Sequence, residues 1–284
     1  MKAIRTATLF LTAALAVSQA STLGYVSDGT TIYTIDPTSG AVLDTQTLSV
    51  GSLDGMAINS GGTLFGDFNN SGVGQLGAID PTTGNVTPVG SPFTDASRHS
   101  WSAGPLAFDQ TGALYSYSGE SILLVDPSSG FVTDELAVSG GVGFAFDASC
   151  TAWLSDGGDE KLYSVGQGCG GFPGPPTGSG TGGTPVEPTN PTGSGPFQAY
   201  ITALSTTSNG LFFGILTNSP GSLELISFNP DTASNPIDPT VIGGLPSNVT
   251  SLAIESDFTP EPAGVALMGI GLAALLFYRR RRVR

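Results

Sequence analysis

Basic residues and histidine are scarce in this chain of 284 residues. Only 9 residues are Lys or Arg against 23 Asp or Glu; 2 of the 9 stand in the first five positions and 5 in the last six. Arg98 and Lys161 are therefore the only basic residues of the body, which is strongly acidic. Nucleic-acid binding requires clustered Lys and Arg that displace counterions from phosphates. We expect no nucleic-acid partner.

Helix-forming sequence is also sparse. The chain contains 41 Gly and 20 Pro but only 11% charged residues, and both Gly and Pro destabilise helix interiors. This composition predicts an all-β fold of short strands joined by tight turns.

Long apolar runs occur only at the two ends. Lys2 and Arg5 precede an apolar stretch over 7–17, and small residues follow in "SQA" at 18–20. This order is typical of a secretory signal peptide. We predict that residues 1–20 form the signal, that the general export machinery carries the chain across the cytoplasmic membrane, and that signal peptidase cuts after Ala20.

Cysteine is limited to Cys150 and Cys169. An exported chain meets an oxidising environment, so we predict one disulfide between them. The alternative, half of a structural zinc site, would need four ligands, and His99 is the only histidine of the chain.

Two sequence elements repeat along the body. "YTIDPTSGAV" from Tyr33 returns as "GAIDPTTGNV" from Gly77 and "LLVDPSSGFV" from Leu123. In such a segment the Asp accepts backbone N–H groups, the Pro presets φ and the Gly supplies positive φ, which predicts turns between strands. A second element begins at Pro105 with "PLAFDQTGALYSYS", and similar segments begin at Gly55, Gly143 and Ile201. Each has an apolar pair, a polar turn and another apolar strand, which is the pattern of a β-hairpin.

Periods of 40 to 50 residues with about four short strands each are typical of β-propeller blades. The fragment at 249–257 resembles the first strand of a blade, and 22–50 resembles a blade that lacks it. Pairing the two closes the ring and removes the open sheet edge. We predict a single β-propeller over 21–258, with five blades rather than six. The blades are expected at 249–257 with 22–50, and at 53–92, 103–139, 141–197 and 199–247.

A Gly- and Pro-rich segment runs from 166 to 196. Its composition does not suit a buried core, so we expect a flexible excursion from the fourth blade rather than an interdomain linker.

The C-terminal segment 259–284 combines three features. Pro260, Glu261 and Pro262 precede an apolar run over 263–278, and Arg279, Arg280, Arg281 and Arg282 follow. We predict a transmembrane helix over 263–278 whose Arg-rich end stays in the cytoplasm.

These three features in this order resemble the PEP-CTERM sorting signal. The resemblance covers the last 27 residues and implies processing by an exosortase, a membrane-embedded peptidase that would recognise Pro260 to Pro262 and remove the helix. The protein would be anchored in the membrane before processing, and would reach the cell surface or extracellular space afterwards. The body more loosely resembles propellers with NHL-like or quinoprotein-like repeats, a resemblance of fold that implies no activity.

The inventory of reactive residues favours a protein without enzymatic activity, catalytic residues, metal ligands or cofactors. His99 is expected on a surface loop, and no Gly-x-Ser-x-Gly elbow is present. Lactonase-type propellers hold a divalent metal in the channel, and Asp54, Asp109 and Asp147 are the candidates for the alternative, a metal-dependent hydrolase. Asp109 and Asp147 occupy equivalent repeat positions, which instead favours a role in turns.

Exposed aromatic residues at the ends of a propeller channel could stack on sugars. The candidates are Trp101, Trp153, Tyr115 and Tyr117, although Trp153 and Tyr115 fit packed strand positions better. The favoured hypothesis is a sorted surface or matrix propeller in adhesion or exopolysaccharide and biofilm organisation, with polysaccharide as a possible partner.

Overall fold

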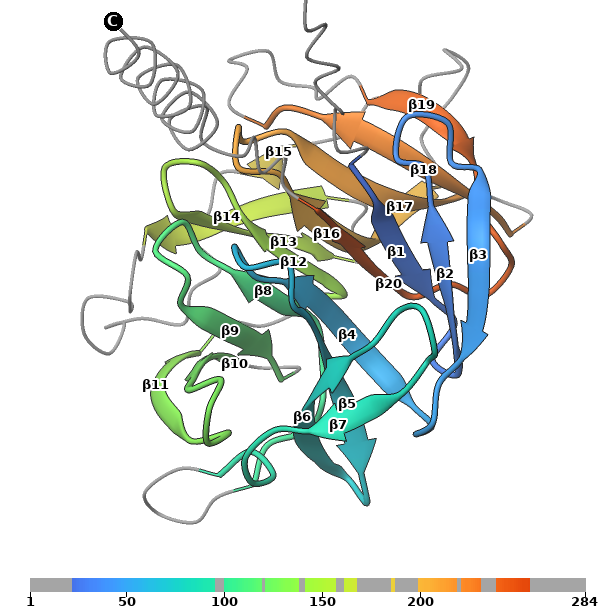
Figure 1. The fold of residues 1–284 in the computed structure, drawn as a ribbon. Coiled ribbons are helices and arrows are strands. Elements are labelled where there is room, and N and C mark those ends of the chain that lie inside the picture. The colour runs from blue at the N-terminus through green and yellow to red at the C-terminus, as the bar shows by residue number, and fades with distance from the viewer. Residues whose placement is uncertain are drawn as a thin grey trace, which may run out of the picture.

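The protein folds into strands throughout the part of the chain that the computed structural model describes. The described residues are 22–94, 100–118, 121–137, 141–156, 161–167, 185–186, 199–218, 221–230 and 239–255. They form five antiparallel sheets of four strands each, arranged as the blades of a propeller (Figure 1). This confirms the prediction of an all-β, five-bladed propeller.

Each blade has an innermost strand at the channel and an outermost strand at the rim. In that order, the five blades are β20 (Ser251–Ile254), β1 (Gly24–Ser27), β2 (Thr31–Ile35), β3 (Val42–Thr47); β4 (Leu53–Ile58), β5 (Leu64–Asn70), β6 (Val73–Ile79), β7 (Val86–Pro88); β8 (Leu106–Phe108), β9 (Leu114–Tyr117), β10 (Ser121–Val125), β11 (Val132–Ala137); β12 (Gly143–Phe146), β13 (Thr151–Asp156), β14 (Lys161–Gln167), β15 (Pro185–Val186); and β16 (Ala199–Thr206), β17 (Phe212–Asn218), β18 (Ser222–Phe228), β19 (Thr240–Gly244).

The innermost strands form the ring around the channel. Strands β4, β8, β12, β16 and β20 each contact the next one round, and β20 returns to β4. The ring closes as predicted, because β20 pairs with β1 from Gly24 opposite Ile254 to Ser27 opposite Ser251. The Ile254 amide also donates to Ser205 Oγ of the fifth blade at 3.0 Å.

The hydrophobic core lies between the blades. Each of the five apolar clusters combines buried residues of two neighbouring blades. Between the third and fourth blades, for example, Tyr117 and Ile122 pack with Phe144 and Leu154. No blade can bury its faces alone, so the ring folds as one domain.

The repeated Asp-Pro segments form the predicted turns. Asp80 Oδ1 accepts the Thr82 amide at 2.9 Å and the Thr82 hydroxyl at 2.7 Å, and Oδ2 accepts the Thr83 hydroxyl at 2.7 Å. Gly84 completes the turn with φ of 74°. Asp36 and Asp126 have the same set of partners. These three carboxylates are therefore engaged by their own turns.

The fourth blade takes its outermost strand from the Gly- and Pro-rich segment. Strand β15 pairs with β14 through Pro185 opposite Tyr163 and Val186 opposite Leu162. The segment 166–196, expected to be a flexible excursion, thus contributes to the sheet.

Several predicted features lie outside the described residues. They are the signal peptide 1–20, His99, Cys169, and the tail 259–284 with Pro260, Glu261, Pro262 and Arg279 to Arg282. Across the described ranges, no helix is long and apolar enough to cross a membrane.

Candidate functional site at the channel

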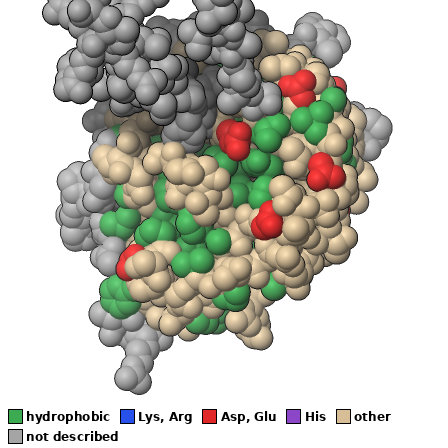
Figure 2. All heavy atoms as spheres, in the orientation of Figure 1, with side chains coloured by type: hydrophobic (Ala, Val, Ile, Leu, Met, Phe, Trp, Pro, Cys, Tyr) green, Lys and Arg blue, Asp and Glu red, His purple; other side chains and the backbone are tan. Residues whose placement is uncertain are grey.

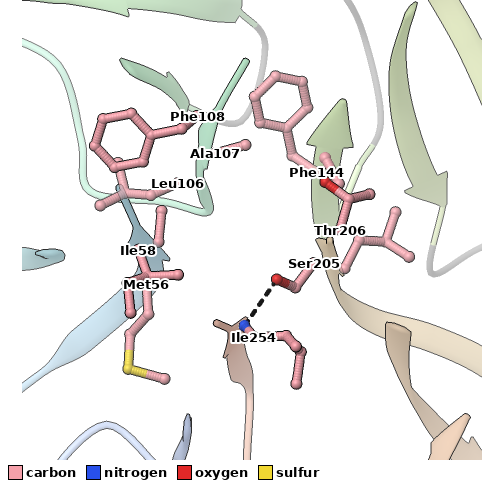
Figure 3. A pocket seen from close by; sticks show the side chains of 12 residues that line it. Met56, Ile58, Leu106, Ala107, Phe108, Phe144, Ser205, Thr206 and Ile254 are labelled. Atoms are coloured by element: carbon pink, nitrogen blue, oxygen red, sulfur yellow. Dashed lines mark hydrogen bonds between the residues drawn. The ribbon is translucent and has the colours of Figure 1, made fainter. Parts of the chain in front are cut away.

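The channel is narrow and lined mostly by apolar side chains at the end where the innermost strands finish. A cavity of about 40 Å³ lies there, and Figure 3 shows Met56, Phe108 and Phe144 around it with Ser205 and Thr206 on one side. A water molecule needs a cavity of roughly 10 to 15 Å³. The cavity therefore has room for a few waters but not for a sugar ring.

The cavity at the other end of the channel is smaller and includes a carboxyl group in its lining. Its cavity of about 10 Å³ is lined by Asp54, Pro105, Val142, Thr250 and Ser251 among others. Burial raises the pKa of Asp54. Asp54 is thus the one acidic side chain among the described residues that line either cavity.

The structure separates the three aspartates proposed for a hydrolase. Asp54 belongs to the start of β4, whereas Asp109 and Asp147 directly follow β8 and β12, at the opposite end of the channel. In the described ranges no three His, Cys, Asp or Glu side chains come together in a way that could hold a metal ion.

Asp109 and Asp147 have the turn role that their repeat positions predicted. Asp109 Oδ1 accepts the amides of Thr111 and Ala113 at 2.8 and 2.9 Å. Asp147 Oδ1 accepts the amides of Ser149 and Thr151 at 2.9 and 2.8 Å. Both carboxylates therefore hold a hairpin together rather than face the channel.

Asp147 is buried yet charged. Its exposed fraction is 1%, and Asp147 Oδ2 accepts the indole N–H of Trp153 at 2.9 Å. Burial alone would raise the pKa of Asp147, but the hydrogen bonds from Trp153, Ser149 and Thr151 outweigh it and lower the pKa below its usual value.

Three of the four aromatic candidates are core residues. Tyr115, Tyr117 and Trp153 are 0%, 1% and 7% exposed, so the proposal that they stack on a ligand is wrong, and the packed alternative preferred for Tyr115 and Trp153 is correct. Trp101 is partly exposed and packs against the cluster between the second and third blades. Among these four, only Trp101 has a surface that a ligand could contact.

Sequence reasoning missed Asp67, on β5. Its side chain is 0% exposed, and burial raises its pKa to about 8, helped by the nearby charge of Asp54 and opposed by hydrogen bonding from Gly104, Ser116 and Gln75. The signal was present in "LFGDF": an acidic residue inside an apolar strand pattern is costly to bury.

Cys150 is disulfide-bonded. Since Cys169 lies outside the described residues, its pairing with Cys150 stays a prediction.

The surface carries little positive charge. Figure 2 shows scattered Asp and Glu side chains and no Lys, Arg or His on the described part of this face. Lys161 is the only basic residue within the described ranges. The acidic character of the body is thus also seen on the described part of this face.

The chain is similar in fold to several solved structures. A putative gluconolactonase has a TM-score of 0.50 with 13% identity, covering 82% of each chain. A gluconolactonase from Xanthomonas campestris has a TM-score of 0.49 with 12% identity, covering 82% of this chain and 80% of that one. Hydrazine synthase from Kuenenia stuttgartiensis has a TM-score of 0.40 with 15% identity over 67% of this chain, which spans about half, 49%, of the hydrazine synthase chain. At 13% identity, the likeness to the putative gluconolactonase shows the fold alone.

No curated protein matches the chain. The PEP-CTERM protein-sorting motif matches residues 258–282. The match contains the Pro-Glu-Pro segment, the apolar run and the four arginines from which the sorting signal was predicted. The motif implies export, anchoring by the C-terminal segment and processing by an exosortase. The chain is therefore a five-bladed β-propeller that carries a PEP-CTERM sorting motif at its C-terminal end.

Proposed function

We propose that this propeller acts without catalysis, as a binding or structural module at the cell surface or in the extracellular matrix, in adhesion or exopolysaccharide and biofilm organisation. The observation that carries the proposal is the form of the channel. Of the two channel cavities that the described residues line, the larger, about 40 Å³, has mostly apolar side chains such as Met56, Phe108 and Phe144 around it. Small-molecule sites in proteins usually enclose roughly 300 to 1,000 Å³.

The chemistry of the body supports the same proposal. The aspartates of the repeated turns accept hydrogen bonds from their own turns, and Asp109 and Asp147 do so in the hairpins. These side chains stabilise the fold, and their carboxylates have few acceptor sites left for a substrate. The ligand surface would then be the outside of the propeller, where an acidic polymer would be repelled and a neutral or cationic one favoured.

The test is a pair of binding and activity measurements on the full chain. We expect retention on a subset of neutral or cationic polysaccharides in an array, and no turnover of a panel of lactones with or without calcium. Calcium-dependent lactone hydrolysis that is lost in Asp54→Asn would overturn the proposal.

That outcome would establish the second candidate, a metal-dependent hydrolase. The observation in its favour is Asp54, a partly buried carboxyl group with a raised pKa at the narrow end of the channel. Asp44→Asn is the matched control, because Asp44 lies on the exposed strand β3, away from the channel.

A further inference from the structure

Asp67 lies at the contact between the second and third blades. Its Oδ2 accepts the Gly104 amide at 3.1 Å and the Ser116 hydroxyl at 3.0 Å. Gly104 belongs to the segment that enters β8, and Ser116 belongs to β9, so both donors come from the third blade. One carboxyl group of β5 therefore connects the second blade to two elements of its neighbour.

The second oxygen of this carboxyl group is buried and lacks a comparable donor. Among the described residues, Asp67 Oδ1 has no hydrogen-bond partner of normal geometry. It is covered by Gly74, since a Cβ built there would lie 3.0 Å from Oδ1 and 2.6 Å from the Phe93 ring. The cover is fixed by the Gly74 amide, which donates to the Trp101 carbonyl oxygen at 2.7 Å, and by the Phe93 amide, which donates to the Gly74 carbonyl oxygen at 2.8 Å.

The surroundings disfavour a negative charge at this position. An ionised carboxylate offers about four acceptor sites, and here two are filled by neutral donors. On the elements packed against Asp67, the described titratable side chains are Asp54 on β4 and Tyr115 and Tyr117 on β9; β6 and segment 100–105 have none. Arg98 and His99 lie outside the described residues. The negative charge of Asp54 repels a charge on Asp67 and so raises the pKa of Asp67 further.

Asp147 shows what a buried aspartate needs to stay charged in this fold. It receives two amides, a hydroxyl and an indole N–H. Asp67 receives one amide and one hydroxyl of normal geometry, and the Gln75 backbone contributes least to its pKa. Its carboxyl group is therefore neutral below about pH 8 when the blades are packed as observed.

We propose that the Asp67 carboxyl group is a pH-sensitive latch between the second and third blades, which is closed when the group is neutral and loosened when it ionises. An ionised Oδ1 attracts water, and water reaches it by displacing the cover formed by Gly74 and segment 100–104. The residues that follow Gly104, Pro105 and Leu106, line the cavity at the narrow end of the channel. Ionisation thus changes the channel mouth next to Asp54.

The pH dependence of stability follows from the raised pKa of Asp67. The pKa of Asp67 is about 8 in the folded protein and about 4 in an unfolded chain. Its contribution to stability is therefore complete below about pH 4 and is lost as the pH rises to about 8. An exported protein is exposed to external pH, so this range is physiologically accessible.

The first experiment compares full-length wild type, Asp67→Asn and Asp44→Asn in detergent between pH 5 and 9. Asn keeps an acceptor for Gly104 and Ser116 but cannot ionise. We expect the wild-type melting temperature to fall across this range, the fall to persist in Asp44→Asn, and the curve of Asp67→Asn to be flatter. An unchanged fall in Asp67→Asn would overturn the proposal.

A second readout separates a latch from a merely destabilising group. We expect hydrogen-exchange protection of the Gly74 and Gly104 amides to drop on the order of tenfold per pH unit from about pH 5 to 8 and to level off above that, in wild type but not in Asp67→Asn. Constant protection in wild type would overturn the proposal. If Asp67→Asn does not fold, the proposal is tested by following the carbon-13 shifts of the aspartate carboxyl groups of the wild type against pH. A titration midpoint near 8 supports the latch. Midpoints that all lie below about 5 refute it.

Discussion

The amide of Ser49 in the first blade donates to the carbonyl oxygen of Gly84 in the second blade at 2.9 Å. Ser49 Oγ also accepts the Val86 amide at 2.8 Å. The Asp126 turn repeats the arrangement, because the Ser91 amide of the second blade donates to the Ser129 carbonyl oxygen of the third at 2.9 Å. The repeated Asp-Pro turns therefore join each of these blades to the one before it, besides reversing the chain.

Replacing Gly84 by Ala should break this connection. A Cβ there would lie 2.1 Å from the Thr47 carbonyl oxygen, and φ is 74°. Left-handed strain of about 1 to 2 kcal/mol adds to overpacking of about 1 to 3 kcal/mol. We expect urea unfolding to show a loss of about 3 kcal/mol.

Gly62→Ala is the matched control for that substitution. Gly62 has φ of 79°, but nothing lies within 4 Å of a Cβ built on it. Its loss should be limited to the conformational cost of about 1 to 2 kcal/mol. Equal losses at the two sites would contradict a role for Gly84 in joining blades.

Ring closure predicts opposite results for two truncations. Ending the chain after residue 258 removes only the sorting segment, so we expect the unfolding temperature of the full chain. Ending it after residue 248 removes β20, in which Leu252, Ala253 and Ile254 are at most 2% exposed. The β1 edge would then be open to other chains.

We expect that shorter chain to aggregate or to remain unfolded, as measured by circular dichroism and light scattering. A soluble chain of 248 residues with a cooperative transition would show that the closing strand is dispensable.

The blades were predictable because their turn chemistry is local. In the Asp80 turn, the Asp, the two hydroxyl residues and Gly84 contact one another within five residues, so the sequence pattern and the structure carry the same information. Strand β20 was predictable for a different reason: it was the missing first strand of an otherwise complete blade.

The environment of Asp67 was not predictable in this way. Its partners Gly104 and Ser116 lie 37 and 49 positions away in the sequence, and the burial of its carboxyl group depends on how the third blade covers the second. Tyr117 failed as a stacking candidate for the same reason, since it packs with Phe144 of the next blade. Repeats predict strands and turns, whereas contacts between blades depend on each pair of neighbours.

The predicted Cys150 to Cys169 disulfide can be checked directly. It would close a loop of about 20 residues, for which cross-linking is worth about 3 kcal/mol. We expect peptide mapping without reductant to yield one Cys150–Cys169 peptide, and reduction to lower the unfolding free energy by that amount. A disulfide-linked dimer with no such peptide would show that Cys150 pairs between chains.

Asp147 and Asp67 should respond in opposite directions to the same chemical change. In Asp147→Asn an NH₂ group replaces one carboxylate oxygen, which accepts from Trp153, Ser149 or Thr151. The NH₂ group then faces another N–H donor and neither can accept a hydrogen bond. We expect a loss of about 2 to 3 kcal/mol at pH 7. In Asp67→Asn the folded protein no longer has to hold a proton that the unfolded chain releases, so we expect a gain at the same pH.

The pH profiles of the two variants complete the argument. The folded pKa of Asp147 is lowered, so its contribution is present above about pH 4 and is lost as the pH falls through the folded value. Asp147→Asn should therefore flatten the acid side of the stability curve, and Asp67→Asn the side between about pH 4 and 8. Urea unfolding at half-unit steps from pH 3 to 9 measures both. If both variants lost unfolding free energy with the same pH profile, the number of hydrogen bonds around each carboxyl group would not determine its charge.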